Sequence, residues 1–178
     1  MSRFIVGNTF EQLAALLSHP HFNFLDLAQA LAETVESKHA TRHIRAFLKE
    51  VEWLTITDLQ ELYSKTFDLN PVTSPALSVH LFGVESFKRS HLMVGLLDMY
   101  RNASYVSTGE SADHMSTVIG FLPCASPVDR KELSTYVILP GLTKMADFLA
   151  SKNNHYAHLL RAACEIVETE AGKETAYA

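Results

Sequence analysis

Cysteine is scarce in this sequence, and its placement excludes two classes of small protein. The chain of 178 residues holds only Cys124 and Cys164, and they form no CxxC pair. A disulfide framework or a zinc ribbon needs more cysteines at closer spacing. Both residues stand among apolar neighbours, so we expect two small buried side chains in a reducing compartment.

Long hydrophobic runs and turn-forming residues are also few. The chain has 7 glycines and 6 prolines, too few for a loop-rich β-sandwich or a fibrous repeat. The longest apolar runs, such as 136–139, fall far short of the roughly 20 residues that span a bilayer. The first residues carry one basic side chain, Arg3, and no long apolar segment, which argues against a secretory signal. We therefore expect a cytoplasmic protein without direct membrane insertion.

An excess of positive charge is missing as well. The 15 Lys and Arg residues are outnumbered by 20 Asp and Glu residues, for a formal net charge of -5. Proteins that bind nucleic acid generally are basic, because phosphate neutralisation dominates their affinity. No nucleic-acid partner is expected, whereas a mildly acidic surface suits a cationic one.

The residues that are present predict one helical domain. Hydrophobic residues make up 47% of the chain, enough for a single sizeable core. Apolar residues recur at helical spacing nearly everywhere, most clearly over 44–54, and no credible strand pair is found. We predict an all-α, single-domain helical bundle over 1–178, with about eight or nine helices. A long polar and flexible loop is expected at 103–112, and a frayed polar tail at 170–178.

Local signals predict where several helices begin and end. Thr9 with Gln12, and Thr57 with Gln60, resemble capping boxes. Ser74 followed by Pro75 predicts the start of a short helix that ends at Gly83.

Two further expectations concern the longer helices. The helix over 85–102 is apolar on more than one side, which predicts a central position in the bundle. Pro140 and Gly141 are expected to kink or break the helix that contains them.

The familiar catalytic motifs are absent, and the histidines leave one alternative open. The sequence has no phosphate-binding loop and no GxSxG, HExxH or GxGxxG. No base is recognisable beside Cys124, so no nucleophile is assigned and no enzyme is expected. Its nine histidines include pairs at 39/43, 155/158 and 19/21, each able to supply two metal ligands. No third ligand stands at a recognised spacing, so no metal is predicted, although a histidine-based metal or small-ligand protein remains the alternative function.

One ordered set of motifs is specific. Residues 61–71 read ELYSKTFDLNP, residues 80–83 read HLFG, a Leu97-x-x-Tyr100 helix end follows, and Asp113-His114 comes next. In this order the segments resemble the NarJ-like nitrate reductase delta-subunit family. These proteins are molybdenum-cofactor assembly chaperones, redox enzyme maturation proteins related to the TorD/DmsD chaperones. Ser111-Ala112 stand where the family has Leu-Pro, and Ser111 is expected to cap the next helix.

The resemblance implies a dedicated chaperone and not an enzyme. Such a protein binds the N-terminal peptide of the apo catalytic subunit of a molybdoenzyme, for example respiratory nitrate reductase. It assists insertion of the molybdenum cofactor and assembly of the complex, and it keeps no cofactor itself. Molybdenum-cofactor biosynthesis proteins are further possible partners. A monomer is expected, with a minor dimer through helix exchange at the long loop.

A helical bundle with a groove can take an amphipathic peptide by burying its apolar face, and this suggests where the client binds. The predicted client-binding residues are Tyr63, Phe67, Asp68, Asn70, Pro71, His80, Phe82, Tyr100, Asp113 and His114. For Tyr63 and Phe67, core packing is the competing interpretation, since they share a stripe with Leu59 and Leu62. For Asp113 the competing role is a helix cap in a first turn. The Asn70-Pro71 pair could simply build a turn.

Overall fold

The computed structural model describes residues 7–107 and 109–175. Over these residues the chain forms helices and no β-strand, which confirms the predicted all-α class. Ten α-helices are present in the described part, slightly more than the eight or nine expected. The first are α1 (Thr9–Leu16), α2 (Phe24–Thr34), α3 (Lys38–Val51), α4 (Ile56–Phe67), α5 (Leu77–Phe82) and α6 (Phe87–Asn102). They are followed by α7 (Met115–Phe121), a 3-10 turn (Leu122–Cys124), α8 (Pro127–Leu133), a π-helical turn (Ser134–Ile138), α9 (Leu139–Ser151) and α10 (Tyr156–Thr175).

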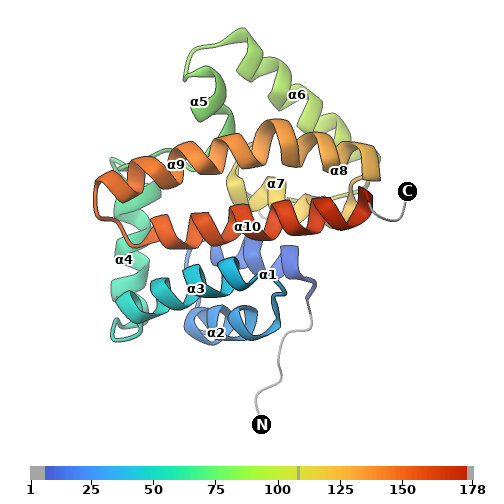
Figure 1. Cartoon of the computed structure of the whole chain (residues 1–178). Helices are drawn as coiled ribbons and strands as arrows, with labels where there is room; N and C mark the ends of the chain where they lie inside the picture. Colours follow the sequence, from blue (N-terminus) through green and yellow to red (C-terminus); the bar gives the residue numbers. More distant parts are fainter. Residues whose placement is uncertain (1–6, 108, 176–178) are drawn as a thin grey trace.

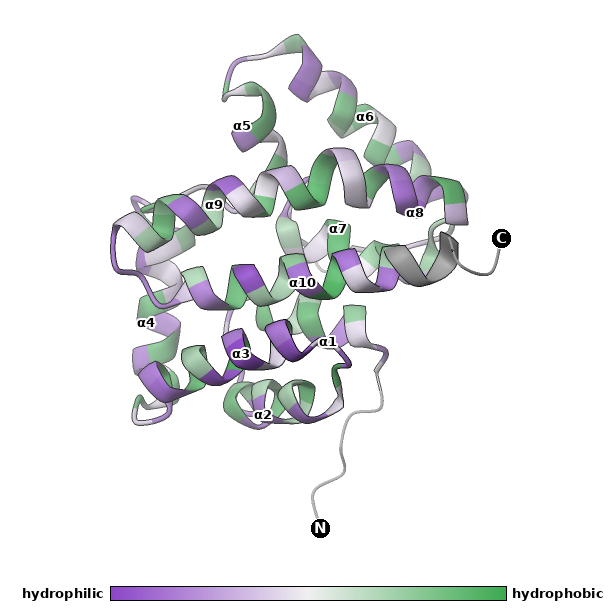
Figure 2. Cartoon of the chain, in the orientation of Figure 1, coloured by the Kyte–Doolittle hydropathy of each residue, from purple (hydrophilic) through white to green (hydrophobic). Residues whose placement is uncertain are grey.

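The centre of the bundle is α10. It lies between α3 and α9 and packs on both along its length (Figure 1). Its inner side chains, among them Leu159, Ala163 and Val167, are fully buried. The outward side of α3 is hydrophilic (Figure 2), as an amphipathic surface helix requires. α10 continues to Thr175, so the segment predicted as a frayed tail from Glu170 is helical up to that residue, and residues 176–178 lie outside the described part.

The segment predicted to be the central helix is instead an outer one. α5 and α6, called the α5–α6 arm below, stand above the helix formed by α8 and α9 in Figure 1, and α6 packs most closely on α5. Only Leu96 and Tyr100 of α6 are buried. The prediction failed because apolar residues on several sides indicate a central helix only if every side meets a neighbour. Phe87 is 88% exposed and Val94 is 59% exposed.

In both α1 and α4, the N-cap lies earlier in the chain than the predicted capping residue. Asn8 caps α1 and pairs with Glu11, where Thr9 with Gln12 was expected. Thr55 caps α4 and pairs with Asp58, where Thr57 with Gln60 was expected. In both, the true cap is the last residue with extended backbone, and the apolar period alone does not fix that residue.

The expected break at Pro140 does not occur. α8, the π-helical turn and α9 run on as one continuous helix, with Pro140 in the first turn of α9. A π turn widens the hydrogen-bond ladder: the Leu139 N–H donates to the Ser134 carbonyl. The missing N–H of Pro140 is thereby accommodated. Gly141 allows α5 to cross this helix closely, since a Cβ there would lie 2.9 Å from Leu77 Cδ2.

An aromatic cluster joins α3, α4 and α10. The Phe67 ring lies 5.1 Å from the Tyr156 ring and packs beside Tyr63, with ring centroids 5.2 Å apart. Phe47 of α3 contacts the same Tyr156 ring. Tyr63 and Phe67 are 1% and 2% exposed, so both belong to the core. Burial raises the pKa of the Tyr63 and Tyr156 hydroxyls.

Phe67→Ala is expected to lower the free energy of unfolding by about 3 to 5 kcal/mol, because it leaves a cavity beside two tyrosines. Urea denaturation followed by circular dichroism measures the change. Phe22→Ala is the control, since Phe22 is 93% exposed, and it should change the free energy by less than about 0.5 kcal/mol. Equal effects of the two substitutions would refute the core role of Phe67.

Candidate functional site

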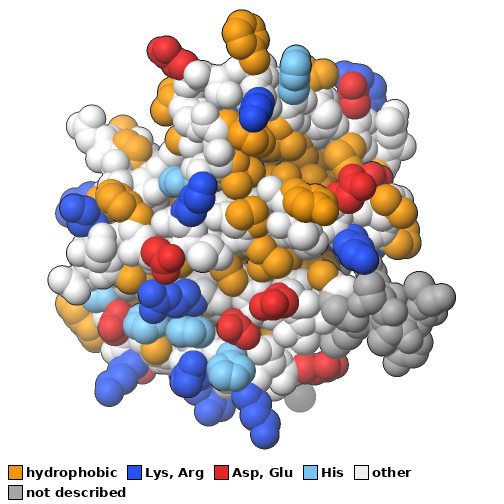
Figure 3. All heavy atoms as spheres, turned by 45° about the horizontal axis from the view of Figure 1, so that its top comes forward, with side chains coloured by type: hydrophobic (Ala, Val, Ile, Leu, Met, Phe, Trp, Pro, Cys, Tyr) orange, Lys and Arg blue, Asp and Glu red, His pale blue; other side chains and the backbone are white. Residues whose placement is uncertain are grey.

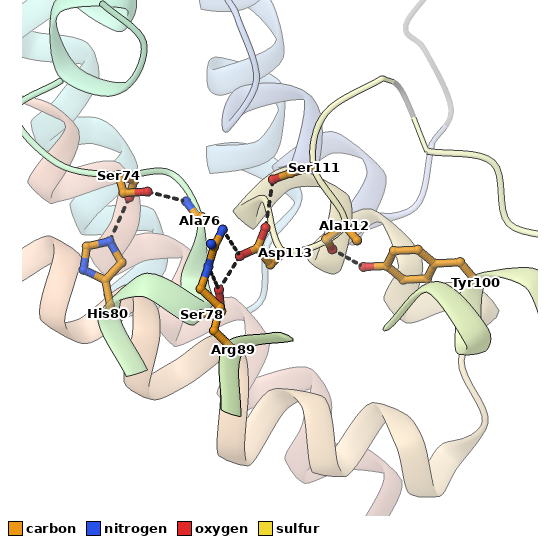
Figure 4. Close-up of polar contacts among 9 residues, drawn as sticks. All are labelled: Ser74, Ala76, Ser78, His80, Arg89, Tyr100, Ser111, Ala112 and Asp113. Atoms are coloured by element: carbon orange, nitrogen blue, oxygen red, sulfur yellow. Dashed lines mark hydrogen bonds and ion pairs between the residues drawn. The ribbon is translucent and has the colours of Figure 1, made fainter. Parts of the chain in front are cut away.

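The carboxylate of Asp113 is a charged group that the fold buries completely. This side chain is 0% exposed, and burying a charge is costly unless it is paired and hydrogen-bonded. Its Oδ1 accepts from the Ser111 hydroxyl at 2.9 Å. Its Oδ2 accepts from the Ser78 hydroxyl of α5 and forms an ion pair with Arg89 Nη2 of α6 at 3.4 Å (Figure 4). Asp113 thus joins the loop before α7 to both helices of the arm.

Ser78 acts as a relay within this network. Its hydroxyl accepts from Arg89 Nε at 2.9 Å and donates to Asp113. Ser78 is 0% exposed, while the Arg89 side chain is 30% exposed. The Arg89 side chain therefore reaches the buried Ser78 and Asp113 from the solvent side.

Backbone hydrogen bonds hold Asp113 in place. The Leu77 N–H donates to the Asp113 carbonyl at 2.9 Å, and the Met115 N–H donates to the Pro75 carbonyl at 2.9 Å. They flank an isolated antiparallel bridge between Ala76 and His114.

Three expectations about helix capping are corrected by this geometry. Asp113 precedes α7 and does not lie in its first turn, because His114 is the N-cap: its Nδ1 accepts from the Ser116 N–H. Ser111 does not cap α7 either, since its hydroxyl is used on Asp113. Ser74 is likewise not the N-cap of α5: its Oγ accepts from the Ala76 N–H, two residues on, and α5 begins only at Leu77.

His114 connects the site to the aromatic cluster. Its Nε2 lies 3.4 Å from the Tyr63 hydroxyl, and its Nδ1 lies 2.7 Å from the Ser116 hydroxyl. Burial lowers the pKa of His114 from its ordinary value, and the nearby carboxylates of Glu110, Asp68 and Asp113 act in the opposite direction. Burial thus disfavours the charged imidazolium, and the imidazole serves as a hydrogen-bonding link.

His80 and Tyr100 secure the two ends of the arm. His80 Nε2 lies 2.8 Å from the Ser74 carbonyl, and its own carbonyl accepts from Lys144 Nζ of α9 at 2.9 Å. The Tyr100 hydroxyl donates to the Ala112 carbonyl at 2.7 Å (Figure 4). Its ring packs on Phe121 of α7, with centroids 4.7 Å apart.

The predicted client-binding residues fall into two groups. The structure buries Tyr63, Phe67, Tyr100, Asp113 and His114. Asp68, Asn70, Pro71 and Phe82 are exposed, and His80 is half-buried. Buried members can affect a client only through the elements that they hold, whereas exposed members are accessible to contact.

The Asn70–Pro71 pair builds a turn at the end of α4. Asn70 has a φ of 49°, in the left-handed region that asparagine tolerates better than most residues. The chain then returns along α4, and the Thr73 N–H donates to the Thr66 carbonyl at 3.1 Å. Gly83, with a φ of 84°, ends α5 as predicted.

The histidine pairs meet in an unexpected combination. His43 Nδ1 of α3 lies 3.4 Å from His158 Nδ1 of α10, and Glu50 contacts both His155 and His158. Burial and the neighbouring His158 lower the pKa of His43.

Within residues 7–107 and 109–175, no group of three or more His, Cys, Asp or Glu side chains could hold a metal ion. The same ranges contain no helix that is long and apolar enough to cross a membrane.

The cysteines differ from their prediction. Cys124 is exposed, so its apolar sequence neighbours did not indicate burial. Cys164 is half-buried beside Thr143, and burial raises its pKa to about 11. A thiol with a raised pKa is a poor nucleophile at neutral pH, because little of it is thiolate.

Apart from Tyr100, a set of residues along one side of α6 was not predicted as part of the site. At helical spacing, one side of α6 carries Arg89, Leu92, Met93, Leu96, Met99 and Tyr100, called the inner stripe below. Leu92 and Met93 are only partly buried, unlike Leu96 and Tyr100 further along. A band of hydrophobic side chains runs between the arm and the α8–α9 helix (Figure 3). The spacing from 89 onward could have revealed this stripe, but apolar residues on the other sides of α6 concealed it.

The buried state of His114 predicts a pH dependence. The unfolded chain binds a proton at His114 near pH 6.5 and the folded chain at a lower pH. As the pH falls below this value, the unfolded state therefore binds more protons than the folded state, and the free energy of unfolding decreases. His114→Asn keeps an N-cap acceptor and should lose less stability than the wild type between about pH 7.5 and pH 5. Urea midpoints across this range measure it, with exposed His21→Asn as control, and parallel curves for wild type and His114→Asn would contradict it.

Comparison with known proteins gives a distant relative. The chain is 27% identical over 157 residues to the nitrate reductase molybdenum cofactor assembly chaperone NarJ of Escherichia coli strain K12, a match that covers 88% of this chain. The same protein from Escherichia coli O157:H7 matches equally. The chain spans 64% of the length of these curated relatives. No protein-family model matches the sequence.

Proposed function

We propose that this chain is an assembly chaperone for a molybdoenzyme, and not an enzyme itself. The observation that carries the proposal is the 27% identity to NarJ over 88% of the chain. The motifs at 61–71, 80–83 and 113–114 agree with it, because they occur in the order that the resemblance to the chaperone family implies. In this role the chain acts in the cytoplasm on the apo catalytic subunit, before its molybdenum cofactor is inserted. A respiratory nitrate reductase is the model client, and molybdenum-cofactor biosynthesis proteins are further partners. The wider relationship to the TorD and DmsD chaperones stays a prediction.

The client segment is the N-terminal peptide of the catalytic subunit, bound as an amphipathic helix. Its site is the surface between the inner stripe of α6 and the α8–α9 helix. Leu92 and Met93 of the inner stripe are partly buried apolar residues, and so is Leu81 of α5. Apolar side chains that are neither fully covered nor fully solvated can still bury area against a peptide helix. The hydrophobic band of Figure 3 follows the same surface.

The buried predicted residues have a supporting role in this scheme. Asp113 and His114 fix the loop on which the arm rests, and Tyr100 anchors the C-terminal half of α6. Tyr63 connects His114 to the core. Phe82, at 38% exposure, and half-buried His80 remain candidates for direct contact with the client. Exposed Asp68 is a candidate for contact with basic client residues.

Met93→Lys should weaken binding of the client peptide by about tenfold or more. The substitution removes apolar area from the stripe and places a positive charge opposite a basic peptide. The probe is a synthetic peptide of about 15 to 30 residues, taken from the N-terminus of a molybdoenzyme catalytic subunit of the same organism. Isothermal titration calorimetry measures the dissociation constant.

The matched control is Val94→Lys, the adjacent residue on the opposite side of the same helix, 59% exposed. It adds the same charge to α6 but should leave the affinity nearly unchanged. Equal losses in both variants would show that the inner stripe is not the binding surface. No heat of binding from the wild type at any salt concentration would refute peptide binding itself.

A further inference from the structure

The N-terminal half of α6 has little apolar support. Its buried side chains, Leu96 and Tyr100, lie in its C-terminal half, and none from Phe87 to Gly95 is buried. The hydrophobic effect therefore holds one end of this helix on the body much more firmly than the other. Yet the open end contains Arg89, whose side chain reaches the buried carboxylate of Asp113.

Arg89 occupies a position in the inner stripe that an apolar residue would normally fill. It stands three and four residues before Leu92 and Met93, on the same side of the helix. From there its guanidinium contacts two groups on two elements: Nε donates to Ser78 of α5 at 2.9 Å, and Nη2 meets Asp113 at 3.4 Å. Arginine suits this geometry because its planar guanidinium presents several donors in a fixed arrangement.

We propose that Arg89 is the positioning residue of the client surface. Its ion pair with Asp113, relayed by Ser78, fixes the distance between the N-terminal half of α6 and the body. That distance sets the width of the apolar surface that Leu92 and Met93 offer, a consequence that rests on the proposed function. A preformed surface binds a helix with less loss of conformational freedom than a loose one.

The other fastenings of the arm do not replace this contact. Lys144 and the close crossing at Gly141 attach α5 to α9, and Tyr100 attaches the far end of α6. Between these points, Arg89 is the α6 side chain that joins the Asp113 network. The surface pair Arg101–Asp98 lies within α6 itself, with both side chains more than half exposed, and contributes nothing to the position of the helix.

Hydrogen exchange of the full-length chain tests the positioning role directly. Arg89→Met should speed amide exchange over residues 88–95 by about tenfold or more, because this half of α6 then opens locally. Exchange in α3 and α10 should stay as in the wild type and serves as the internal reference for the fold. Arg89→Lys should restore part of the protection, since an ammonium can still reach the carboxylate. Arg101→Met, on the same helix, should change nothing, and identical exchange in Arg89→Met and the wild type would overturn the proposal.

Should Arg89→Met unfold the whole chain, Ser78→Ala decides the matter, because it removes the relay and leaves both charges in place. Faster exchange confined to residues 88–95 would support the proposal, and unchanged exchange there would refute it.

Titration of the same variants with the client peptide gives the second measurement. Arg89→Met should bind about tenfold more weakly, and an unchanged affinity would overturn the positioning role. If the wild type binds no peptide, the proposed function fails, whereas the exchange result still decides whether Arg89 holds α6.

Discussion

The buried carboxylate of Asp113 is the constraint on which the position of the α5–α6 arm depends. A charge at 0% exposure must be compensated, and here the compensation comes from three separate segments. Ser78 belongs to α5, Arg89 to α6 and Ser111 to the loop before α7. Removal of one partner from a buried ion pair leaves the other charge uncompensated and costs several kcal/mol. The arm, the loop and α7 are therefore held in one arrangement by electrostatics, where the rest of the bundle is held by apolar packing.

This contrast between electrostatic attachment and apolar packing explains why the arm and the body differ in how far their apolar side chains are buried. α10 buries apolar residues against both α3 and α9, and the aromatic cluster around Tyr156 adds α4. Such a core is closely packed and intolerant of change. The arm has few buried side chains and keeps exposed apolar ones such as Phe87 and Val94. Polar attachment of an apolar element leaves its hydrophobic surface available to a partner, which full burial would not.

Periodicity was sufficient to predict the class of the fold and much of its core. Ile44, Phe47, Leu48 and Val51 of the stripe over 44–54 are buried, as are Tyr63 and Phe67, whereas Leu54 lies beyond the end of α3 and is half-buried. The position of α6 was not predictable, since an apolar helix is equally consistent with a central place and with an exposed functional face. The continuous helix through Pro140 depends on a π turn, which no sequence pattern marks.

The candidate site was predicted in part. The motifs led to Asp113 and His114, in the loop on which the arm rests, and to His80 and Tyr100, which attach its two ends. Arg89 was missed because its partner lies 24 residues away along the chain, and a lone arginine among apolar residues carries no local signal. Similarly, the meeting of His43 with His158 joins members of two different sequence pairs across 115 residues. Contacts of this range follow from tertiary packing and cannot be read from local spacing.

Assistance to the maturation of a molybdoenzyme is tested most directly by the cofactor content of the client. A molybdoenzyme of the same organism would be purified from a strain that lacks the chain and from the same strain with the gene restored. We expect a catalytic subunit that accumulates largely without molybdenum in the deletion strain and regains it on complementation. A catalytic subunit with full molybdenum content and full activity in the deletion strain would contradict the chaperone role.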